Sequence, residues 1–241
     1  MIKRPQGRVF ITGDVHYPKH FKHIRRFPRW CKDLTKNDVL IVCGDLGIIW
    51  SYDPDQNQEG INKFQELPCT VCFVDGNHEN HLVLNNLPKI NKFSSKVRKI
   101  SDSVFYLIRG NVYKINGKKI FAYGGGHSYD KHRRLENINW WPNEIPGIND
   151  QMNAIKNLAI HDWKVDYIVT HTPSEKDIKT INSKEDFYFS NFQDNPETNH
   201  RKFLDTIKSQ LNFRKHYCGH LHIEYKIPQT RVIYKQTLEL K

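Results

Sequence analysis

The sequence predicts an α/β fold built from mixed β-sheets. Short apolar runs rich in β-branched residues alternate with helical patterns over residues 1–90, which is the order of parallel strands joined by crossover helices. From residue 104 the apolar runs follow one another closely, and Asn116-Gly117 between two alternating runs is a strong hairpin signal. The second half therefore predicts antiparallel strands and a second sheet.

The elements of the first half follow from these patterns. Strands are expected at 9–12, 39–43 and 71–74, where β-branched residues run together. Helices are expected near 20–35 and 57–66, and a short helix should follow the turn Gly76-Asn77-His78-Glu79.

The later elements are predicted in the same way. Asn149 is a candidate cap for a helix whose apolar residues share one face. Those residues are Met152, Ile155, Leu158 and Ala159. A strand at 166–170 precedes a polar excursion over 174–196, and Asn195-Pro196 should open a helix to about 211. A strand at 216–218 carries the last motif.

The chain has 241 residues and a formal net charge of +11. Residues 1–36 hold ten Lys/Arg against Asp14 and Asp33, and residues 89–119 hold nine against Asp102. Such stretches attract phosphate-rich partners, nucleic acid among them. The same charge also fits a lysine- and asparagine-rich composition whose charges are merely solvated.

Cysteine use and hydropathy favour a cytoplasmic protein. Five cysteines spread along a long chain do not form a disulfide framework, and Cys69 and Cys72 lead into a strand, as buried thiols would. No apolar stretch approaches the roughly 20 residues that span a bilayer. The start of the chain lacks the apolar region of a signal peptide, so we expect no membrane partner.

Five strand ends carry side chains that bind metals well. After the apolar runs come Asp14 and His16, then Asp45, Asn77, His171, and finally His220 and His222. Strands of an open α/β sheet present the residues that follow them at one edge, where ligands bind. Carboxylate, amide and imidazole groups gathered there predict a pair of divalent ions bridged by a carboxylate. These donors suit manganese first, with iron, zinc or nickel as alternatives to it, and not calcium.

The motifs Asp-x-His, Gly-Asp, Gly-Asn-His-Glu, a lone His and Gly-His-x-His stand in this order from residue 9 to about 225. The chain in this respect resembles the calcineurin-like metallophosphoesterase superfamily. The run GGG-x-S-x-D at 124–130 and WWPNE at 140–144 resemble its small bacterial and phage members. The resemblance implies one domain over residues 1–241, a four-layer αββα sandwich of two mixed β-sheets.

The resemblance also implies roles for the motif residues. One ion would take Asp14, His16 and His222. The other would take Asn77, His171 and His220, with Asp45 bridging the two. His78 would act on the leaving oxygen while a hydroxide between the ions attacks phosphorus. His81 and His127 lie near motifs but are expected not to be ligands.

The chain departs from the protein phosphatases of that superfamily. Its second motif reads GDLGIIW, without the arginine those enzymes carry, and Asn80-His81 follows GNHE where they place another arginine. Both absences disfavour a phosphoprotein substrate. Arg133 and Arg134 in the basic run after 124–130 are candidate replacements that would bind a substrate phosphate.

Three functions stay open at this point. The first is a hydrolase for phosphorylated small molecules or nucleotides. The second is a phosphodiesterase or nuclease acting on nucleic acid. The third is a metal-binding scaffold of the same fold without activity. The sequence leaves the oligomeric state open.

Overall fold

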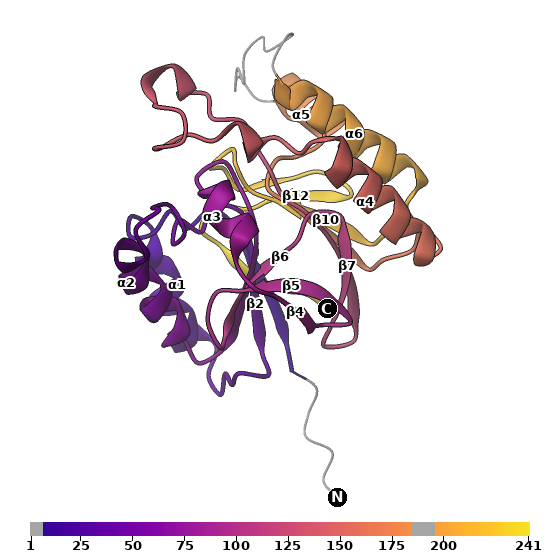
Figure 1. Cartoon of the computed structure of the whole chain (residues 1–241). Coiled ribbons are helices and arrows are strands. Elements are labelled where there is room, and N and C mark those ends of the chain that lie inside the picture. The colour runs from indigo at the N-terminus through magenta and orange to yellow at the C-terminus, as the bar shows by residue number, and fades with distance from the viewer. Residues whose placement is uncertain (1–6, 185–195) are drawn as a thin grey trace, which may run out of the picture.

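Two β-sheets face each other at the centre of the computed structural model, which describes residues 7–184 and 196–241 (Figure 1). Over these residues the first sheet has the order β13-β1-β2-β3-β6-β5-β4. The strands β1, β2, β3 and β6 are parallel, whereas β13, β5 and β4 pair antiparallel. Its strands are β1 (Val9–Thr12), β2 (Val39–Cys43), β3 (Thr70–Val74), β4 (Lys89–Lys92), β5 (Ser95–Lys99), β6 (Val104–Leu107) and β13 (Thr237–Glu239).

The second sheet is also mixed, with the order β11-β12-β10-β9-β8-β7 in the described chain. Asn116 and Gly117 join β7 to β8 with φ of 46° and 82°, as the predicted hairpin turn requires. The two mixed sheets confirm the predicted fold class. The strands of this sheet are β7 (Asn111–Ile115), β8 (Lys118–Tyr123), β9 (Tyr167–Thr170), β10 (Lys215–Cys218), β11 (Tyr225–Lys226) and β12 (Thr230–Val232).

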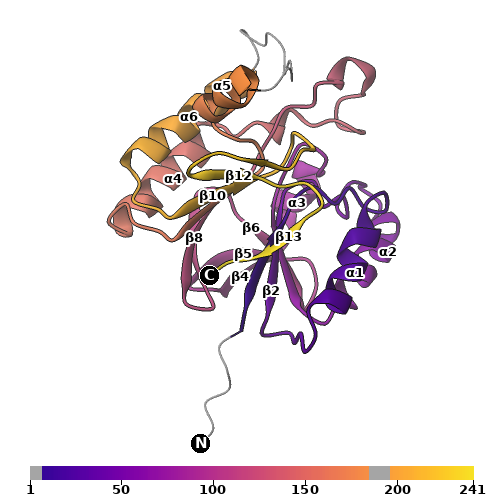
Figure 2. The same cartoon turned by 180° about the vertical axis from the view of Figure 1, so that it is seen from behind.

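Helices cover the outer face of each sheet. In Figures 1 and 2, α1 and α2 lie against the first sheet and α4, α5 and α6 against the second, so the layers follow the order αββα. None of the helices in the described residues has the length and apolar character needed to cross a membrane. The helices are α1 (Phe21–Trp30), α2 (Pro54–Gln65), α3 (His81–Asn86), α4 (Ile148–Ile160), α5 (Glu175–Lys184) and α6 (Pro196–Gln210), with 3-10 turns η1 (Lys131–Arg133) and η2 (Pro142–Glu144).

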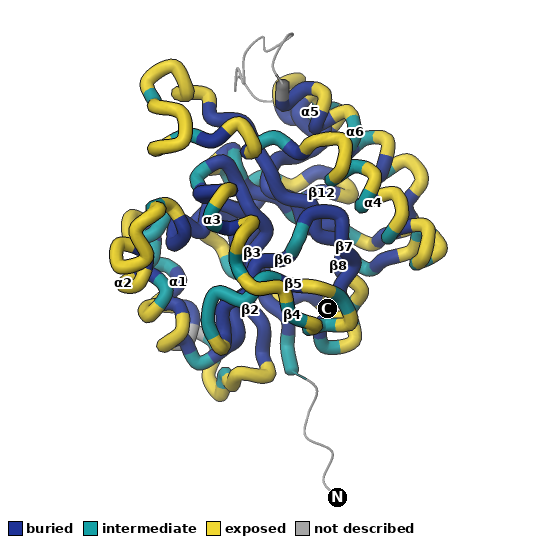
Figure 3. The backbone as a smooth tube through the Cα atoms, viewed as in Figure 1, coloured by how far each residue is buried: buried dark blue, intermediate teal, exposed yellow. Residues whose placement is uncertain are grey.

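The central strands are buried on both faces, as Figure 3 shows by the dark tubes at the middle. Side chains alternate along each strand, so Ile11 faces the other sheet and packs in a cluster with Ile120. Phe10 points the opposite way, into a cluster with Ile24 of α1 and Phe64 of α2. Each such buried side chain contributes about 1.5–3 kcal/mol through the hydrophobic effect. This burial holds the strand ends rigidly.

Two helices differ from the prediction. The first ends at Trp30 instead of 35, and Asp33 beyond it has a φ of 62°, which a helix does not accommodate. The expected polar excursion contains α5, whose Ile178 and Ile181 are buried. Ser174 and Asp177 exchange hydrogen bonds at its start in the manner of a capping box, a signal that the sequence carries.

The helix α4 begins at Ile148 after Gly147, so the prediction of Asn149 as its cap was wrong. The predicted apolar face packs only in part: Leu158 is buried against the second sheet, whereas Met152 is 62% exposed and Ile155 is 47% exposed. Beside Leu158, the packed face uses Ala154 against the backbone of Gly110, which has no side chain in the way. On α6, Pro196 begins the helix as expected, while Asn195 lies outside the described residues.

Candidate metal centre

The carboxyl ends of five parallel strands meet at one edge of the two sheets. Asp14, Asp45 and Asn77 follow β1, β2 and β3 of the first sheet. His171 and His220 follow β9 and β10 of the second sheet. The His220 amide donates to both carboxylate oxygens of Asp14, at 2.9 and 3.0 Å, and this contact ties the two sheets together at the edge.

One group of donor atoms is formed by Asp14, His16, Asp45 and His222, whose ligand atoms all lie within 4.8 Å of one another. The Nε2 atoms of His16 and His222 are 2.8 Å apart. His16 Nε2 lies 3.6 Å from Asp45 Oδ2, and His222 Nε2 lies 3.9 Å from Asp14 Oδ1. Two imidazoles and two carboxylates thus converge on one point.

A second group is formed by Asp45, His171 and His220. His171 Nε2 lies 3.4 Å from Asp45 Oδ2, 3.0 Å from His220 Nδ1 and 3.1 Å from Asn77 Oδ1. The Nδ1 atom of His171 is 2.7 Å from the Cys43 carbonyl oxygen, a contact that keeps Nε2 turned toward the group. Asp45 belongs to both groups, so the structure brings together all seven side chains predicted as ligands.

The backbone is strained where these side chains project. His16, Asp45, His220 and His222 have φ of 44°, 50°, 68° and 54°, in the left-handed region that non-glycine residues rarely adopt. Each such residue costs about 1–3 kcal/mol, and strain of this kind concentrates at functional sites.

Two motif glycines are required by close contacts. Gly44 has a φ of 85°, and a Cβ there would lie 2.2 Å from Nδ1 of His171. A Cβ on Gly76 would lie 2.1 Å from a carboxylate oxygen of Asp45. Any side chain at either position would displace the ring of His171 or the carboxylate of Asp45.

The electrostatics favour a bound cation. Burial raises the pKa of Asp14 to about 6, while the pKa of Asp45 stays well below its usual value because nearby histidines outweigh its burial. Burial opposes protonation of His171 as well, but Asp45 and Asp14 raise its pKa to about 10. Burial lowers the pKa of His16 to about 3 and that of His222 to about 4. The negative charge that holds a proton on His171 would equally attract a metal ion, and neutral imidazoles are ready to bind one.

The model of the calcineurin-like phosphoesterase family matches residues 7–224. The chain belongs to this family. It is therefore a metal-dependent phosphoesterase, and the resemblance read from the motifs is confirmed. No relative was found among curated proteins.

Two solved structures overlap the phosphoesterase over most of its length. Phosphopantetheinyl hydrolase from Mycobacterium tuberculosis is 16% identical, with 95% of this chain and 88% of that chain covered and a TM-score of 0.42. A protein serine/threonine phosphatase from Saccharomyces cerevisiae, similar to a human phosphatase, is 12% identical, with 95% and 67% covered and a TM-score of 0.36. The family assignment rests on the match over residues 7–224 and not on these two overlaps.

A cavity of about 330 Å³ opens beside the donor groups of the phosphoesterase. His78 lines it, and Nδ1 of His78 lies 3.4 Å from Nη1 of Arg134, which also lines it. Arg134 is held by two bonds to Asp130, at 2.7 and 2.8 Å. Arg133 is exposed in η1 and is not part of this lining, so the structure brings only one of the two predicted arginines to the site.

Sequence reasoning did not assign several buried residues around the donor groups. Glu79 accepts backbone bonds from Gly47 and Gly76 and so braces two motif turns; burial raises its pKa to about 8. Glu197 of α6 places Oε1 3.1 Å from His220 Nε2, and Ser128 accepts from the Asn77 amide at 3.2 Å. Ser128 belongs to the conspicuous GGG-x-S-x-D run, which could have drawn attention to it. No pattern in α6 marks Glu197.

His81 and His127 do not join the donor groups. His81 is buried with its Nδ1 3.5 Å from Asp75, and burial lowers its pKa to about 4. His127 places its Nδ1 3.3 Å from Glu144. Both were expected not to be ligands, and their contacts lie with other carboxylates.

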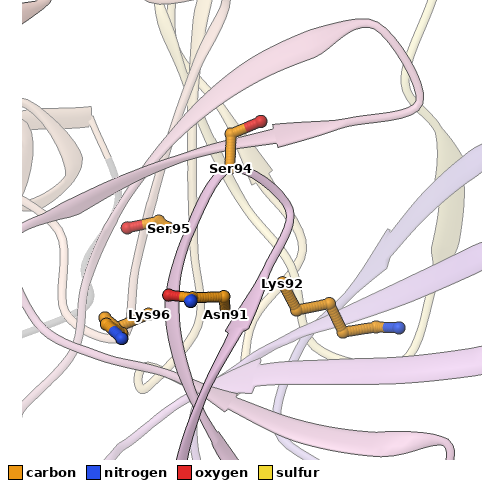
Figure 4. Close-up of a pocket in the computed structure, with 5 residues that line it drawn as sticks. All are labelled: Asn91, Lys92, Ser94, Ser95 and Lys96. Carbon is orange, nitrogen blue, oxygen red and sulfur yellow. The ribbon is translucent and has the colours of Figure 1, made fainter.

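A larger cavity of about 530 Å³ lies at the β4–β5 hairpin of the phosphoesterase. Figure 4 shows its lining, with Lys92 and Lys96 extending to opposite sides of the hairpin. The described lining residues include no carboxylate or imidazole, so this cavity offers no metal ligands. Lysines on an edge strand such as β4 also discourage pairing with other chains.

Proposed function

We propose that the protein hydrolyses phosphate monoesters of small molecules or nucleotides with two divalent ions, manganese first among them. The observation that carries the proposal is the position of Asp45, which belongs to both donor groups. A shared carboxylate is what two neighbouring cations require, because its charge offsets their repulsion. A single-ion site would need only one of these groups.

The residues present fit such a pair of ions. Asp14, His16 and His222 would hold one, Asn77, His171 and His220 the other, with Asp45 between them. When bound, divalent cations supply Lewis acidity, which activates water and offsets the charge of a phosphate. The protein's contribution is a rigid, largely buried set of donors at the strand ends.

His78 is proposed to act on the leaving oxygen. It is half-buried and faces the cavity, and burial lowers its pKa, with Arg134 adding to the effect. A neutral imidazole donates an N–H hydrogen bond to an oxygen that gains negative charge in the transition state. A dianionic phosphate in the cavity would raise the pKa of His78 and favour proton transfer.

Arg134 is proposed to contact the substrate phosphate. Its guanidinium lies in the cavity lining beside His78 and is oriented by Asp130, so its position is fixed before substrate binds. A charge-assisted bond from a fixed arginine adds both affinity and orientation. Arg133, although proposed from the same run, is exposed and would contribute only long-range charge.

Two other functions remain alternatives. A phosphodiesterase or nuclease would use the same ions, and the net charge of +11 favours contact with nucleic acid. A scaffold without activity is disfavoured because the chain belongs to a family of phosphoesterases. We rank the monoesterase first, because the Gly-Asn-His-Glu motif resembles that of monoesterases and dinucleoside-polyphosphate hydrolases, the diesterase second and the scaffold third.

A substrate panel tests the proposal. The protein is freed of metal, loaded with manganese and assayed on an aryl phosphate monoester, a bis-aryl phosphodiester, a cyclic nucleotide, a dinucleoside polyphosphate, and DNA and RNA. The highest kcat/KM is expected on monoesters or nucleotides. A preference for the diester or the nucleic acids would favour the second function. No turnover of any substrate, with two ions bound, would favour the scaffold.

A further inference from the structure

A buried chain of hydrogen bonds leads from Asn77 away from the donor groups. The Nδ2 atom of Asn77 donates to the Ser128 hydroxyl at 3.2 Å. That hydroxyl donates to Oε2 of Glu144 at 2.6 Å, and the Ser128 amide donates to Oε1 of the same carboxylate at 2.9 Å. All three residues are at most 4% exposed. Ser128 comes from the GGG-x-S-x-D run and Glu144 from WWPNE.

We propose that Ser128 and Glu144 are positioning residues. They fix the side-chain amide of Asn77 with its Oδ1 atom toward the second metal ion. The proposal rests on the proposed function, because it presumes that ion. It also gives a role to the runs GGG-x-S-x-D and WWPNE. Together they would set the affinity for the second metal ion without affecting the affinity for the first.

The direction of these hydrogen bonds follows from which groups can donate a proton. An ionised carboxylate only accepts, so the Ser128 hydroxyl must give its single proton to Glu144. The oxygen of Ser128 is then left as an acceptor, and only the NH₂ end of the Asn77 amide can satisfy it. The Oδ1 end therefore points toward His171 Nε2, 3.1 Å away, where the second donor group lies.

Glu144 is well placed to stay ionised. It lies near Nδ1 of His127 and receives two bonds from Ser128. Residues 127–129 also support the predicted ligand His220. The backbone N–H of His127 and the hydroxyl of Tyr129 both donate to Glu197, which faces His220. Partners of this kind around a ligand usually change metal affinity by about 10–100-fold when removed.

The first test measures manganese binding to metal-free protein by calorimetry and elemental analysis, with no activity assay. The wild type should bind two ions. Ser128→Ala should weaken one of them by about 10–100-fold and leave the other unchanged. Ser103→Ala is the matched control, because Ser103 is also buried but bonds to Lys36 at the start of β6. It should bind both ions as the wild type does.

The second test reverses the donor and acceptor roles along the hydrogen bonds from Glu144 to Asn77. Glu144→Gln should weaken binding of the second ion in the wild-type background. If the new amide turns its oxygen to the Ser128 N–H, its NH₂ group faces the Ser128 hydroxyl, whose proton must then go to the Asn77 oxygen. If the amide turns the other way, its NH₂ group faces the Ser128 N–H and that bond is lost. In an Asn77→Asp background the same change should strengthen binding. There the new amide donates to the Ser128 oxygen, and the hydroxyl proton turns to the introduced carboxylate. A purely structural role predicts the same sign in both backgrounds.

The outcomes separate the two proposals. A wild type that binds fewer than two ions overturns the proposed function, whatever the variants do. A wild type with two ions, together with Ser128→Ala binding both equally well, overturns the positioning role alone. Where Ser128→Ala does not fold, as judged by circular dichroism, the sign of the Glu144→Gln effect in the two backgrounds decides.

Discussion

The Nε2 atoms of His16 and His222 lie 2.8 Å apart, although 206 positions separate these residues in the chain. Both rings are neutral near pH 7, because burial lowers the pKa of His16 to about 3 and that of His222 to about 4. At most one proton fits between the two nitrogens. With the carboxylates of Asp14 and Asp45 alongside, the pair forms a negatively charged pocket of donors that a cation would stabilise.

Metal removal should therefore destabilise the protein. At a free manganese concentration of 100 times the dissociation constant, each site should add about 2.7 kcal/mol to the free energy of unfolding. Urea unfolding with a chelator and with manganese measures the difference. In His222→Ala the gain should fall by roughly one site's share. An undiminished gain in that variant would remove His222 from the ligand set.

Asp45→Asn should disrupt the paired ions more than any other single change. The amide keeps the shape of the side chain but loses the charge that offsets two neighbouring cations. Electron paramagnetic resonance of the manganese-loaded protein should lose the signal of coupled ions, and turnover should be abolished. Asp102→Asn is the control, because Asp102 is exposed and pairs only with Lys99 in the described structure. An active variant with two coupled ions would rule out a bridging role.

His78→Ala should separate chemistry from metal binding. His78 lines the cavity but belongs to neither donor group, so both ions should stay bound. Loss of a positioned proton donor usually lowers turnover by about 10²–10⁴-fold. Elemental analysis and kcat measure the two effects, and His132→Ala in the exposed η1 turn is the control. Loss of a metal ion, or full activity, would contradict the role given to His78.

The donor groups could be predicted because their determinants are local. A buried strand, a glycine and a polar residue are adjacent in the sequence, and parallel strands bring such segments to one edge. Asp45 and His171 therefore needed only the strand predictions to be placed near each other. The Asn116-Gly117 hairpin was predictable for the same reason, since the turn dictates its own backbone angles.

The surroundings of the site could not be predicted, because their determinants are tertiary. Glu197 reaches His220 only through the packing of α6 on the second sheet, and nothing near Glu197 in the sequence marks it. The contact face of α4 depends on Gly110, which lies in the turn between β6 and β7. There, Asn153 and Asn157 donate to the backbone carbonyls of Arg109 and Gly110, so of the apolar face expected from periodicity Leu158 packs and Met152 and Ile155 do not.

Arg134 and Arg133 should differ in their effect on substrate. Arg134 lies in the cavity lining and is oriented by Asp130, so Arg134→Ala removes a charge-assisted bond worth about 1.5–3 kcal/mol. The expected loss in kcat/KM on a phosphate monoester is about 10–100-fold. Arg133→Ala removes the same charge from an exposed position and should change kcat/KM less than about twofold. Equal effects of the two variants would mean that net charge, and not a fixed contact, attracts the substrate.

His200 should make the protein sensitive to acid. It is buried on α6 against Tyr123, its two ring nitrogens have no hydrogen-bond partner among the described residues, and burial lowers its pKa to about 3. Between pH 6.5 and 3 the unfolded chain binds a proton at His200 that the folded chain does not, so stability falls as the pH falls. With an unfolded pKa near 6.5, the loss from this group is about 2 kcal/mol at pH 5 and negligible at pH 8. His200→Phe keeps a ring beside Tyr123 and removes the titration. Urea unfolding at pH 5 and pH 8 should therefore show a smaller pH-dependent loss in the variant, and an equal loss in both proteins would mean that other groups control acid unfolding.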